Sequence, residues 1–211
     1  MKKIPIGIED FKMLISDDYF YIDKTKFIEE IMNDGALVKL FTRPRRFGKT
    51  LNMSMLKYFF DVRDAEENRK LFKDLEIENS SYFKEQGKYP VIFISMKDIK
   101  EMSFDKAITE VKNLLKKIYN QFEFIREKLN EGELIEFDNI WLEKNDNNLR
   151  KALLNLAIFL QKYYQKKVIV LIDEYDTPLV SAYRYGYYKE AKSFFSGLYG
   201  SVLKDNTVLQ M

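Results

Sequence analysis

The sequence contains no cysteine and no histidine. Without cysteine there can be no disulfide bond or thiol nucleophile, and without either residue there can be no Cys/His zinc site or histidine acid–base catalysis. Any chemistry must therefore use carboxylates, lysine, hydroxyl groups or an ion held by carboxylates, such as magnesium. The lack of cysteine also fits a reducing cytoplasm, which is the location we expect.

The sequence also lacks long apolar runs and a strong excess of one charge. No run approaches the ~20 apolar residues that a membrane span needs, and the N-terminus has no apolar core like that of a signal peptide. We therefore expect no membrane association. The formal net charge is only +2, so composition does not support direct nucleic-acid binding. With 46% hydrophobic residues among 211, the chain can bury a substantial core.

The strongest local signal begins with an apolar run at residues 36–42, which predicts a buried strand. A basic turn follows, then Gly48-Lys49-Thr50 and a segment with helical spacing. A strand, an anion-binding turn and a helix N-terminus are the layout of a nucleotide-binding phosphate loop. The alternative is an ordinary turn with a surface lysine.

The entry to this loop departs from the usual pattern, which opens with a glycine five positions before Gly48. Here Arg43 and then Pro44 stand at that point. Because proline fixes φ and has no N–H, we expect a stiffer loop with fewer backbone donors. Arg43, Arg45 and Arg46 could bind phosphate, reach a neighbouring subunit as a stimulatory finger, or pair with local carboxylates.

A second signal lies at residues 168–172, five consecutive branched apolar residues that predict a strand covered on both faces. Asp173 and Glu174 follow it directly. Parallel strands bring their carboxyl ends to one sheet edge, where ligands bind. There Asp173 would complete the shell of a magnesium ion, and Glu174, on the other side of the extended chain, would orient the water that attacks the γ-phosphate. The alternative is that both residues merely cap the strand and begin a turn.

These two signals define the candidate site. Its nucleotide-binding residues are Arg46, Phe47, Gly48, Lys49, Thr50 and Leu51, its metal-binding residues are Thr50 and Asp173, and its catalytic residues are Lys49 and Glu174. Lys49 would reach the β- and γ-phosphates, and the Thr50 hydroxyl would bind the ion.

Strands alternating with helices predict an α/β fold with a parallel sheet flanked by helices. We expect an N-terminal segment, residues 1–35, that packs on a core of residues 36–211 with a charged insertion at about 61–88. Other expected elements are a helix ending at residue 33, a helix after Lys49, a strand at 91–94, a long helix from Ser103 to Ile125, a loop at 130–148, and helices at 149–164 and 187–203.

Two groups of side chains leave alternatives open. Asp23 and Thr25 are expected to cap the helix that ends at residue 33, and the alternative is a role near the nucleotide base. Tyrosines and an arginine late in the chain favour a half-buried helix face, and the alternative is base stacking. That group consists of Tyr183, Arg184, Tyr185, Tyr187 and Tyr188.

Several blocks of the sequence resemble the bacterial AAA-ATPase-like family, whose longer members carry a C-terminal domain similar to PD-(D/E)XK nucleases. The blocks are Ile4-Pro-Ile-Gly7, Tyr21-Ile-Asp-Lys-Thr25, Arg43-Pro-Arg-Arg-Phe-Gly-Lys-Thr50, Tyr89-Pro-Val-Ile92, Leu171-Ile-Asp-Glu-Tyr-Asp-Thr-Pro178 and Leu203-Lys-Asp-Asn206. The resemblance implies a P-loop ATP-binding domain with an extra strand between the two motif strands, in which the missing first glycine is normal. Lys49, Thr50, Asp173 and Glu174 match its two nucleotide motifs.

The chain departs from the family pattern at its end. Family members continue into a strand with a polar sensor residue, a helical lid and the nuclease-like domain, whereas residues 208–211 are at most the start of that strand. We therefore expect a C-terminally truncated P-loop fold in which ATP turnover is slow or absent.

The leading hypothesis is a P-loop ATPase domain that, in its complete form, hydrolyses ATP with Mg²⁺ to drive a conformational change in an attached or partner module. The alternative is a non-catalytic nucleotide-sensing or protein-interaction module, and a small-molecule kinase is a third reading. The possible partners are ATP, a second copy of the chain and, in longer relatives, a nuclease-like C-terminal domain.

Overall fold

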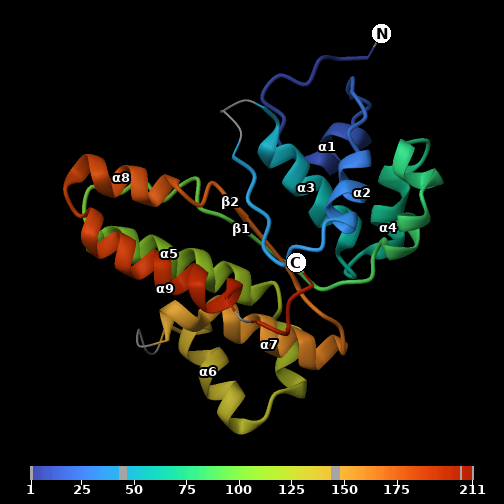
Figure 1. Cartoon of the computed structure of the whole chain (residues 1–211). Coiled ribbons are helices and arrows are strands. Elements are labelled where there is room, and N and C mark those ends of the chain that lie inside the picture. Colours follow the sequence, from blue (N-terminus) through green and yellow to red (C-terminus); the bar gives the residue numbers. More distant parts are fainter. Residues whose placement is uncertain (1, 43–46, 144–147, 205, 211) are drawn as a thin grey trace. The chain divides into compact units, whose positions relative to one another are not determined.

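The structure is a computed structural model that describes residues 2–42, 47–143, 148–204 and 206–210 (Figure 1). The chain divides after Val91 into two compact units. Unit 1 holds the residues up to Val91 and unit 2 holds Ile92 to Gln210, and each is described by itself. The boundary expected after residue 35 lies inside unit 1 and stays a prediction.

Unit 1 is helical. Its elements are α1 (Phe11–Ser16), α2 (Lys26–Asn33), α3 (Lys49–Phe60), α4 (Ala65–Arg69) and the short 3₁₀ helices η1 (Lys70–Phe72), η2 (Glu76–Asn79) and η3 (Ser81–Glu85). The expected helices ending at residue 33 and starting at Lys49 are confirmed. The region 61–88, expected as a charged insertion, forms short helices and loops.

The core of unit 1 forms around α3 and is largely aromatic. Met55, Phe59 and Phe60 of α3 are fully buried. The ring of Phe59 meets Phe72 edge to face at 5.2 Å between centroids, and Phe11 stacks on the same Phe72 ring at 5.2 Å. Aromatic rings bury large apolar areas and favour these offset and edge geometries. The hydrophobic face of α3 thereby fixes the helix whose first turn carries Lys49.

Polar contacts join the start of α1 to α3. The Asp10 carboxylate accepts the backbone N–H of Met13 at 2.9 Å, which caps α1, and its other oxygen accepts the Tyr58 hydroxyl at 2.9 Å. The backbone N–H of Phe11 donates to the Ser54 hydroxyl at 2.7 Å. Burial, and then the hydrogen bond to Asp10, raise the pKa of Tyr58, so this hydroxyl stays a donor.

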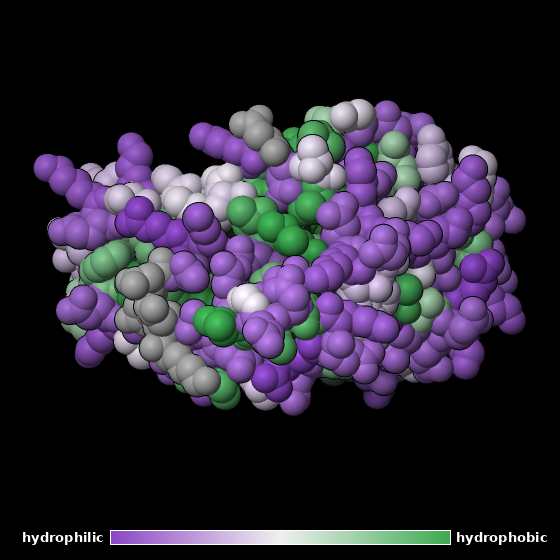
Figure 2. Space-filling model, turned by 90° about the horizontal axis from the view of Figure 1, so that it is seen from below, coloured by the Kyte–Doolittle hydropathy of each residue, from purple (hydrophilic) through white to green (hydrophobic). Residues whose placement is uncertain are grey.

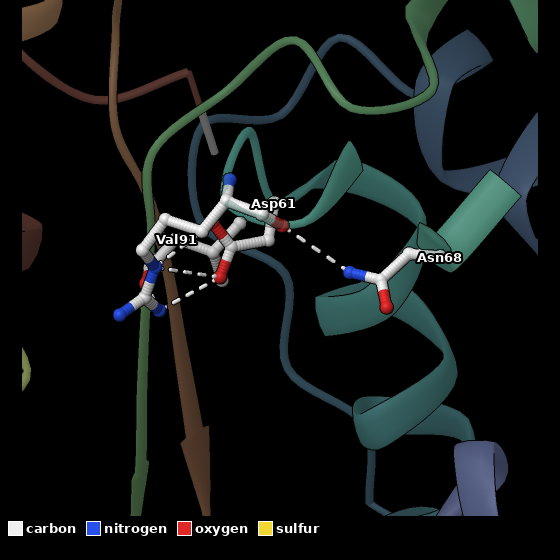
Figure 3. A network of polar contacts seen from close by, with 4 residues as sticks. Asp61, Asn68 and Val91 are labelled. Atoms are coloured by element: carbon white, nitrogen blue, oxygen red, sulfur yellow. Dashed lines mark hydrogen bonds and ion pairs between the residues drawn. The ribbon is translucent and has the colours of Figure 1, made fainter. Parts of the chain in front are cut away.

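A part-buried ion pair fixes the end of α3 near the start of the first strand (Figure 3). The Arg63 guanidinium donates to both carboxylate oxygens of Asp61, with a shortest distance of 2.7 Å, and also to the carbonyl of Val91 at 3.4 Å. The Asn68 amide donates to the Arg63 carbonyl at 3.3 Å. Asp61 also forms a parallel backbone bridge with Tyr89. Because the Asp61 carboxylate is buried, its guanidinium partner offsets the cost of desolvation.

The strand expected at residues 36–42 is wrong. These residues lie in neither a helix nor a strand, and Leu37 and Leu40 expose 53% and 65% of their surface. A lone extended segment is not stable as a strand without a pairing partner. The strands of the described structure pair elsewhere, β1 with β2. The apolar pattern of residues 36–42 resembles that of a strand, but a local pattern contains no information on whether another strand pairs with it.

Unit 2 is built on a small parallel sheet. β1 (Val91–Ser95), whose first residue belongs to unit 1, pairs with β2 (Ile169–Asp173). The N–H of Met96 donates to the carbonyl of Asp173 at 3.0 Å. Both strands were expected from their apolar runs, and the result is a mixed helix–strand, α/β architecture. β2 is almost wholly buried, as a strand covered on both faces should be.

The C-terminal segment lies beside β2. Val168 forms a parallel bridge with Leu209, with hydrogen bonds of 2.9 Å from its N–H to the Val208 carbonyl and 2.8 Å from the Gln210 N–H to its own carbonyl. Val168 is an odd number of positions from Asp173, whose carbonyl faces β1. Since backbone groups of consecutive residues face opposite edges of a strand, residues 208–210 lie on the edge of β2 away from β1.

Helices complete unit 2. They are α5 (Phe104–Asn120), η4 (Glu123–Lys128), α6 (Glu131–Trp141), η5 (Leu149–Lys151), α7 (Ala152–Tyr164), α8 (Thr177–Tyr185) and α9 (Tyr188–Leu203). The helices expected at 149–164 and 187–203 are confirmed. The long helix expected up to Ile125 ends earlier, at Asn120, because the chain there tightens into η4. No range was predicted for α8 from the sequence. Gly186, the residue that follows this helix, has a left-handed φ of 85°.

The loop expected at residues 130–148 is wrong for its first half, which forms α6. Asn130 accepts the N–H of Glu133 at 3.0 Å, and the Glu133 carboxylate accepts the N–H of Asn130 at 2.8 Å. This reciprocal capping box satisfies two N–H groups at the helix start. Phe137 and Ile140, three positions apart, bury the inner face of α6.

Hydrophilic side chains cover most of the face seen in Figure 2, with apolar side chains interspersed in small groups. Within the described residues, the helices are too short or too polar to cross a bilayer.

Candidate functional site

The phosphate-loop half of the candidate site lies in unit 1. Gly48 precedes the first residue of α3 with φ 73° and ψ 22°, a left-handed conformation that residues with a Cβ rarely adopt. Its carbonyl accepts the N–H of Asn52 at 2.9 Å, so the helix begins at this glycine. Lys49, Thr50 and Leu51 form the first turn of α3. N–H groups in the first turn of a helix lack intrahelical acceptors and attract anions.

Of the remaining residues of the expected loop, the structure describes Phe47 but not Arg46. Phe47 is exposed, with 57% of its surface accessible. Arg46, with Arg43, Pro44 and Arg45, lies outside the described residues. The proposed roles of these arginines stay predictions.

A pocket of about 480 Å³ opens beside this turn, within unit 1. Its cationic lining comes from Lys24, Lys26 and Lys49, and its aromatic lining from Phe27, Phe41 and Phe47. Glu30, Asn52 and Met53 complete the described lining. The volume lies in the range of small-molecule sites. Sequence reasoning singled out Phe47 and Lys49, but not the other members.

The structure gives Asp23 and Thr25 a structural role. The Asp23 carboxylate accepts the N–H and hydroxyl of Thr25, each at 2.8 Å, and the N–H of Glu76 at 2.7 Å. The Thr25 hydroxyl in turn accepts the N–H of Ile77 at 3.1 Å. Thr25 stands at the start of α2 but makes no side-chain cap. The pair therefore holds η2 against the start of α2, which differs from the expected capping role.

The carboxylate half of the candidate site lies in unit 2. Asp173 is the last residue of β2 and is 4% exposed. The Ser95 hydroxyl, at the end of the adjacent strand β1, donates to its Oδ2 at 3.4 Å. Sequence reasoning missed Ser95. The signal was its position at the carboxyl end of an expected parallel strand, where ligand-binding groups gather.

Glu174 departs from the expected extended conformation. Its φ is 52°, in the left-handed region, so the chain turns sharply directly after Asp173. Its carboxylate accepts the hydroxyl of Thr177, the first residue of α8, at 2.8 Å. A bulky residue in this conformation costs free energy, and such outliers are typical of functional sites.

The donor atoms of the two halves are suited to magnesium. The Thr50 hydroxyl and the Asp173 carboxylate are hard oxygen ligands, which Mg²⁺ prefers. Among the residues that the structure describes, no cluster of three or more Asp, Glu, His or Cys side chains offers a metal cage. A magnesium ion is usually held by one or two protein ligands together with substrate phosphates and water, so a site of this kind needs no such cage.

The late tyrosines divide into two groups. Tyr187, the residue before α9, is buried, and its hydroxyl donates to the Glu101 carbonyl at 2.7 Å. Tyr183, by contrast, is 79% exposed, and its ring meets that of Tyr188 edge to face at 6.1 Å. The expected half-buried helix face is therefore wrong for Tyr183, and the buried Tyr187 lies between α8 and α9 rather than on one of them.

The fold and site define a class: an α/β protein with a glycine-initiated helix N-terminus beside a cationic pocket, and a buried aspartate at the end of a parallel strand. The chain belongs to the AAA-ATPase-like family, described as "Predicted AAA-ATPase", which it matches over residues 5–211. Membership of this family supports nucleotide and ATP binding.

A relative from Azotobacter chroococcum mcd 1, described as "Uncharacterized protein in vnfD 5'region", is 30% identical over 207 residues. The alignment covers 97% of this chain and 35% of the relative, so the chain spans about a third of that protein's length. No solved structure matches the chain.

Proposed function

We propose that the chain is the ATP-binding domain of a P-loop ATPase. In its complete form the protein would hydrolyse ATP with Mg²⁺, in the cytoplasm, to drive a conformational change in an attached or partner module. The observation that carries the proposal is the left-handed Gly48 at the start of α3, with Lys49 lining a cationic pocket next to it. A glycine turn that opens a helix is the structural basis of phosphate binding in such loops.

Each motif residue has a proposed task. Lys49 binds the β- and γ-phosphates, and the N–H groups of the first turn of α3 bind phosphate oxygens. Thr50 and Asp173 hold Mg²⁺, which neutralises the charge that develops on the phosphates. Glu174 orients the attacking water and accepts its proton. Arg46, Phe47 and Leu51 would complete the nucleotide contacts.

The module that ATP drives would lie outside this chain. A domain similar to PD-(D/E)XK nucleases is the candidate that the family resemblance suggests, and self-association is a second. The alignment covers only 35% of the relative from Azotobacter chroococcum mcd 1, so most of that protein lies outside the matched region.

The second candidate function is a nucleotide-sensing module that binds ATP without hydrolysis. The observation that favours it is the Glu174 carboxylate, which accepts a hydrogen bond from Thr177 in a strained turn. In this second function the bond holds the carboxylate away from water, whereas in an ATPase the same bond would orient it toward the attacking water.

ATP binding and steady-state phosphate release separate the two functions. The comparison uses the complete protein as wild type, its Glu174→Gln variant and, as a matched control, its Glu190→Gln variant at an exposed glutamate of α9. The ATPase account predicts that Glu174→Gln keeps ATP affinity and loses turnover by about 100-fold or more, the scale of a lost general base. Equal phosphate release by all three proteins would contradict a catalytic Glu174, and ATP binding without phosphate release by the wild type would favour the sensing module.

A further inference from the structure

The pocket beside Lys49 is larger and more aromatic than a phosphate site requires. Its aromatic wall is formed by Phe27 on α2 and Phe41 in the segment that precedes the loop, and their ring centroids are 5.1 Å apart at an interplanar angle of 69°. The two rings therefore meet edge to face and form a corner. Phe41 remains 37% exposed. An aromatic surface left accessible inside a pocket favours a flat apolar ligand group.

The same pocket is cationic. Three lysines line it, Lys24, Lys26 and Lys49, against one carboxylate, Glu30. Lys24 and Lys26 are both exposed at the start of α2, so their ammonium groups are hydrated and available to an anion. The lining thus combines an aromatic corner with an excess of positive charge.

We infer that the purine base of a bound nucleotide stacks in the corner formed by Phe27 and Phe41, with Lys24 and Lys26 contacting its ribose and phosphates. This inference rests on the proposed nucleotide binding and adds the part of the site that holds the base. A nucleotide joins a planar base to a polyanion, which are the two features of the lining. A volume of about 480 Å³ also exceeds what a phosphate group alone would fill.

The base subsite gives a role to one exposed apolar side chain of the segment before the loop. Residues 37–41 leave four apolar side chains accessible, and only Phe41 of these lines the pocket. Base–aromatic stacking is sequence-tolerant because every base has a π-face, and larger purines cover more of a ring than pyrimidines do. ATP and GTP should therefore both bind more tightly than CTP.

Calorimetric titration with ATP and with inorganic tripolyphosphate tests the subsite. The variants are Phe27→Leu and Phe41→Leu, which keep an apolar side chain but remove the ring, together with Phe41→Trp. Phe20→Leu is the matched control, because Phe20 is an exposed phenylalanine of unit 1 that does not line the pocket.

The expected result is a loss of ATP affinity of about 10-fold for each leucine variant, the scale of one lost stacking contact, with tripolyphosphate affinity unchanged. Phe41→Trp should keep or increase ATP affinity, and Phe20→Leu should change neither. Melting temperatures confirm that every variant is folded.

Two results would overturn the inference while leaving nucleotide binding intact. One is unchanged ATP affinity in both leucine variants, and the other is a parallel loss of ATP and tripolyphosphate affinity, which indicates a damaged phosphate site. Failure of the wild type to bind either ligand would contradict the proposed function itself, and the base subsite with it.

Discussion

The hydroxyl of Thr177 donates a hydrogen bond of 2.8 Å to the carboxylate of Glu174. Both residues belong to unit 2, and Thr177 is buried at the start of α8. The bond links the proposed catalytic carboxylate to the first residue of α8, so the position of the Glu174 side chain depends on Thr177. A residue that acts in this way is a positioning residue.

Thr177→Val should lower turnover by about 10-fold at unchanged ATP affinity, because the carboxylate loses the contact that orients it, whereas Thr177→Ser should restore turnover. Steady-state kinetics that separate kcat from KM provide the measurement. A rise in KM without a change in kcat would contradict a positioning role.

The backbone of Glu174 provides a separate prediction. Because its φ is 52°, glycine should be tolerated there better than any residue with a Cβ. Glu174→Gly and Glu174→Ala both remove the carboxylate and its bond to Thr177, so they differ in backbone preference alone. We expect the glycine variant to be more stable by about 1 kcal/mol in urea unfolding. Equal stability would show that the turn after Asp173 carries no strain.

Thr25 should contribute to the stability of unit 1 and not to nucleotide recognition. Its buried hydroxyl accepts the N–H of Ile77, and replacing it with valine would leave that donor without this acceptor. We expect Thr25→Val to lower the free energy of unfolding by about 1–3 kcal/mol, and Thr25→Ser to be close to the wild type. Chemical denaturation measures the difference. A specific loss of ATP affinity at unchanged stability would instead support a role near the nucleotide.

The lowered pKa of Glu133 leads us to expect that the free energy of unfolding of unit 2 depends on pH. Burial raises the pKa of its carboxyl, but the Lys162 ammonium at 2.6 Å and the Asn130 N–H lower it below its ordinary value of 4.5 in the net. Because the folded pKa is the lower one, this stabilisation is fully present above about pH 4.5 and is lost as the pH falls through the folded pKa.

Glu133→Gln should therefore be less stable than the wild type at pH 7, and the difference should shrink as the pH falls below 4.5. Denaturation at a series of pH values measures it, with Glu131→Gln as the control at an exposed position in the same helical turn. A difference that is independent of pH would show that the charge of Glu133 makes no contribution.

Local sequence signals predicted much of the secondary structure. The helices α2, α3, α7 and α9 follow from apolar spacing, and β1 and β2 from short apolar runs bounded by polar residues. The glycine at the start of α3 was also visible as part of Gly48-Lys49-Thr50. These features depend on residues that are close together in the chain, which a sequence pattern can report.

The features that the sequence analysis did not predict were missed for different reasons. α6 begins with Asn130 and Glu133, whose spacing is that of a capping box, so its signal was present but hidden among polar residues. By contrast, the role of Thr25 depends on a contact with Ile77, 52 positions away. Likewise, Ser95 reaches Asp173 across 78 positions. No local pattern specifies which distant backbone group a side chain will meet.

The pocket, too, depends on contacts between distant segments that a local sequence pattern does not specify. Phe27 and Phe41 lie on an expected helix and in an expected strand, and spacing alone would assign both rings to the core. Instead, Phe41 is partly exposed and meets Phe27 at the pocket wall. The candidate base subsite became visible only when these two segments were seen in contact.

The central claim is that the Gly48–Lys49 turn binds the phosphates of ATP. It is tested most directly by calorimetric titration of the wild type and Lys49→Ala with ATP and Mg²⁺. Lys73→Ala, at an exposed lysine of unit 1, is the matched control. We predict that Lys49→Ala weakens ATP binding by about 10-fold or more, the scale of a lost hydrogen-bonded charge contact, while Lys73→Ala binds as the wild type does. Identical ATP affinities for the wild type and Lys49→Ala would contradict the claim.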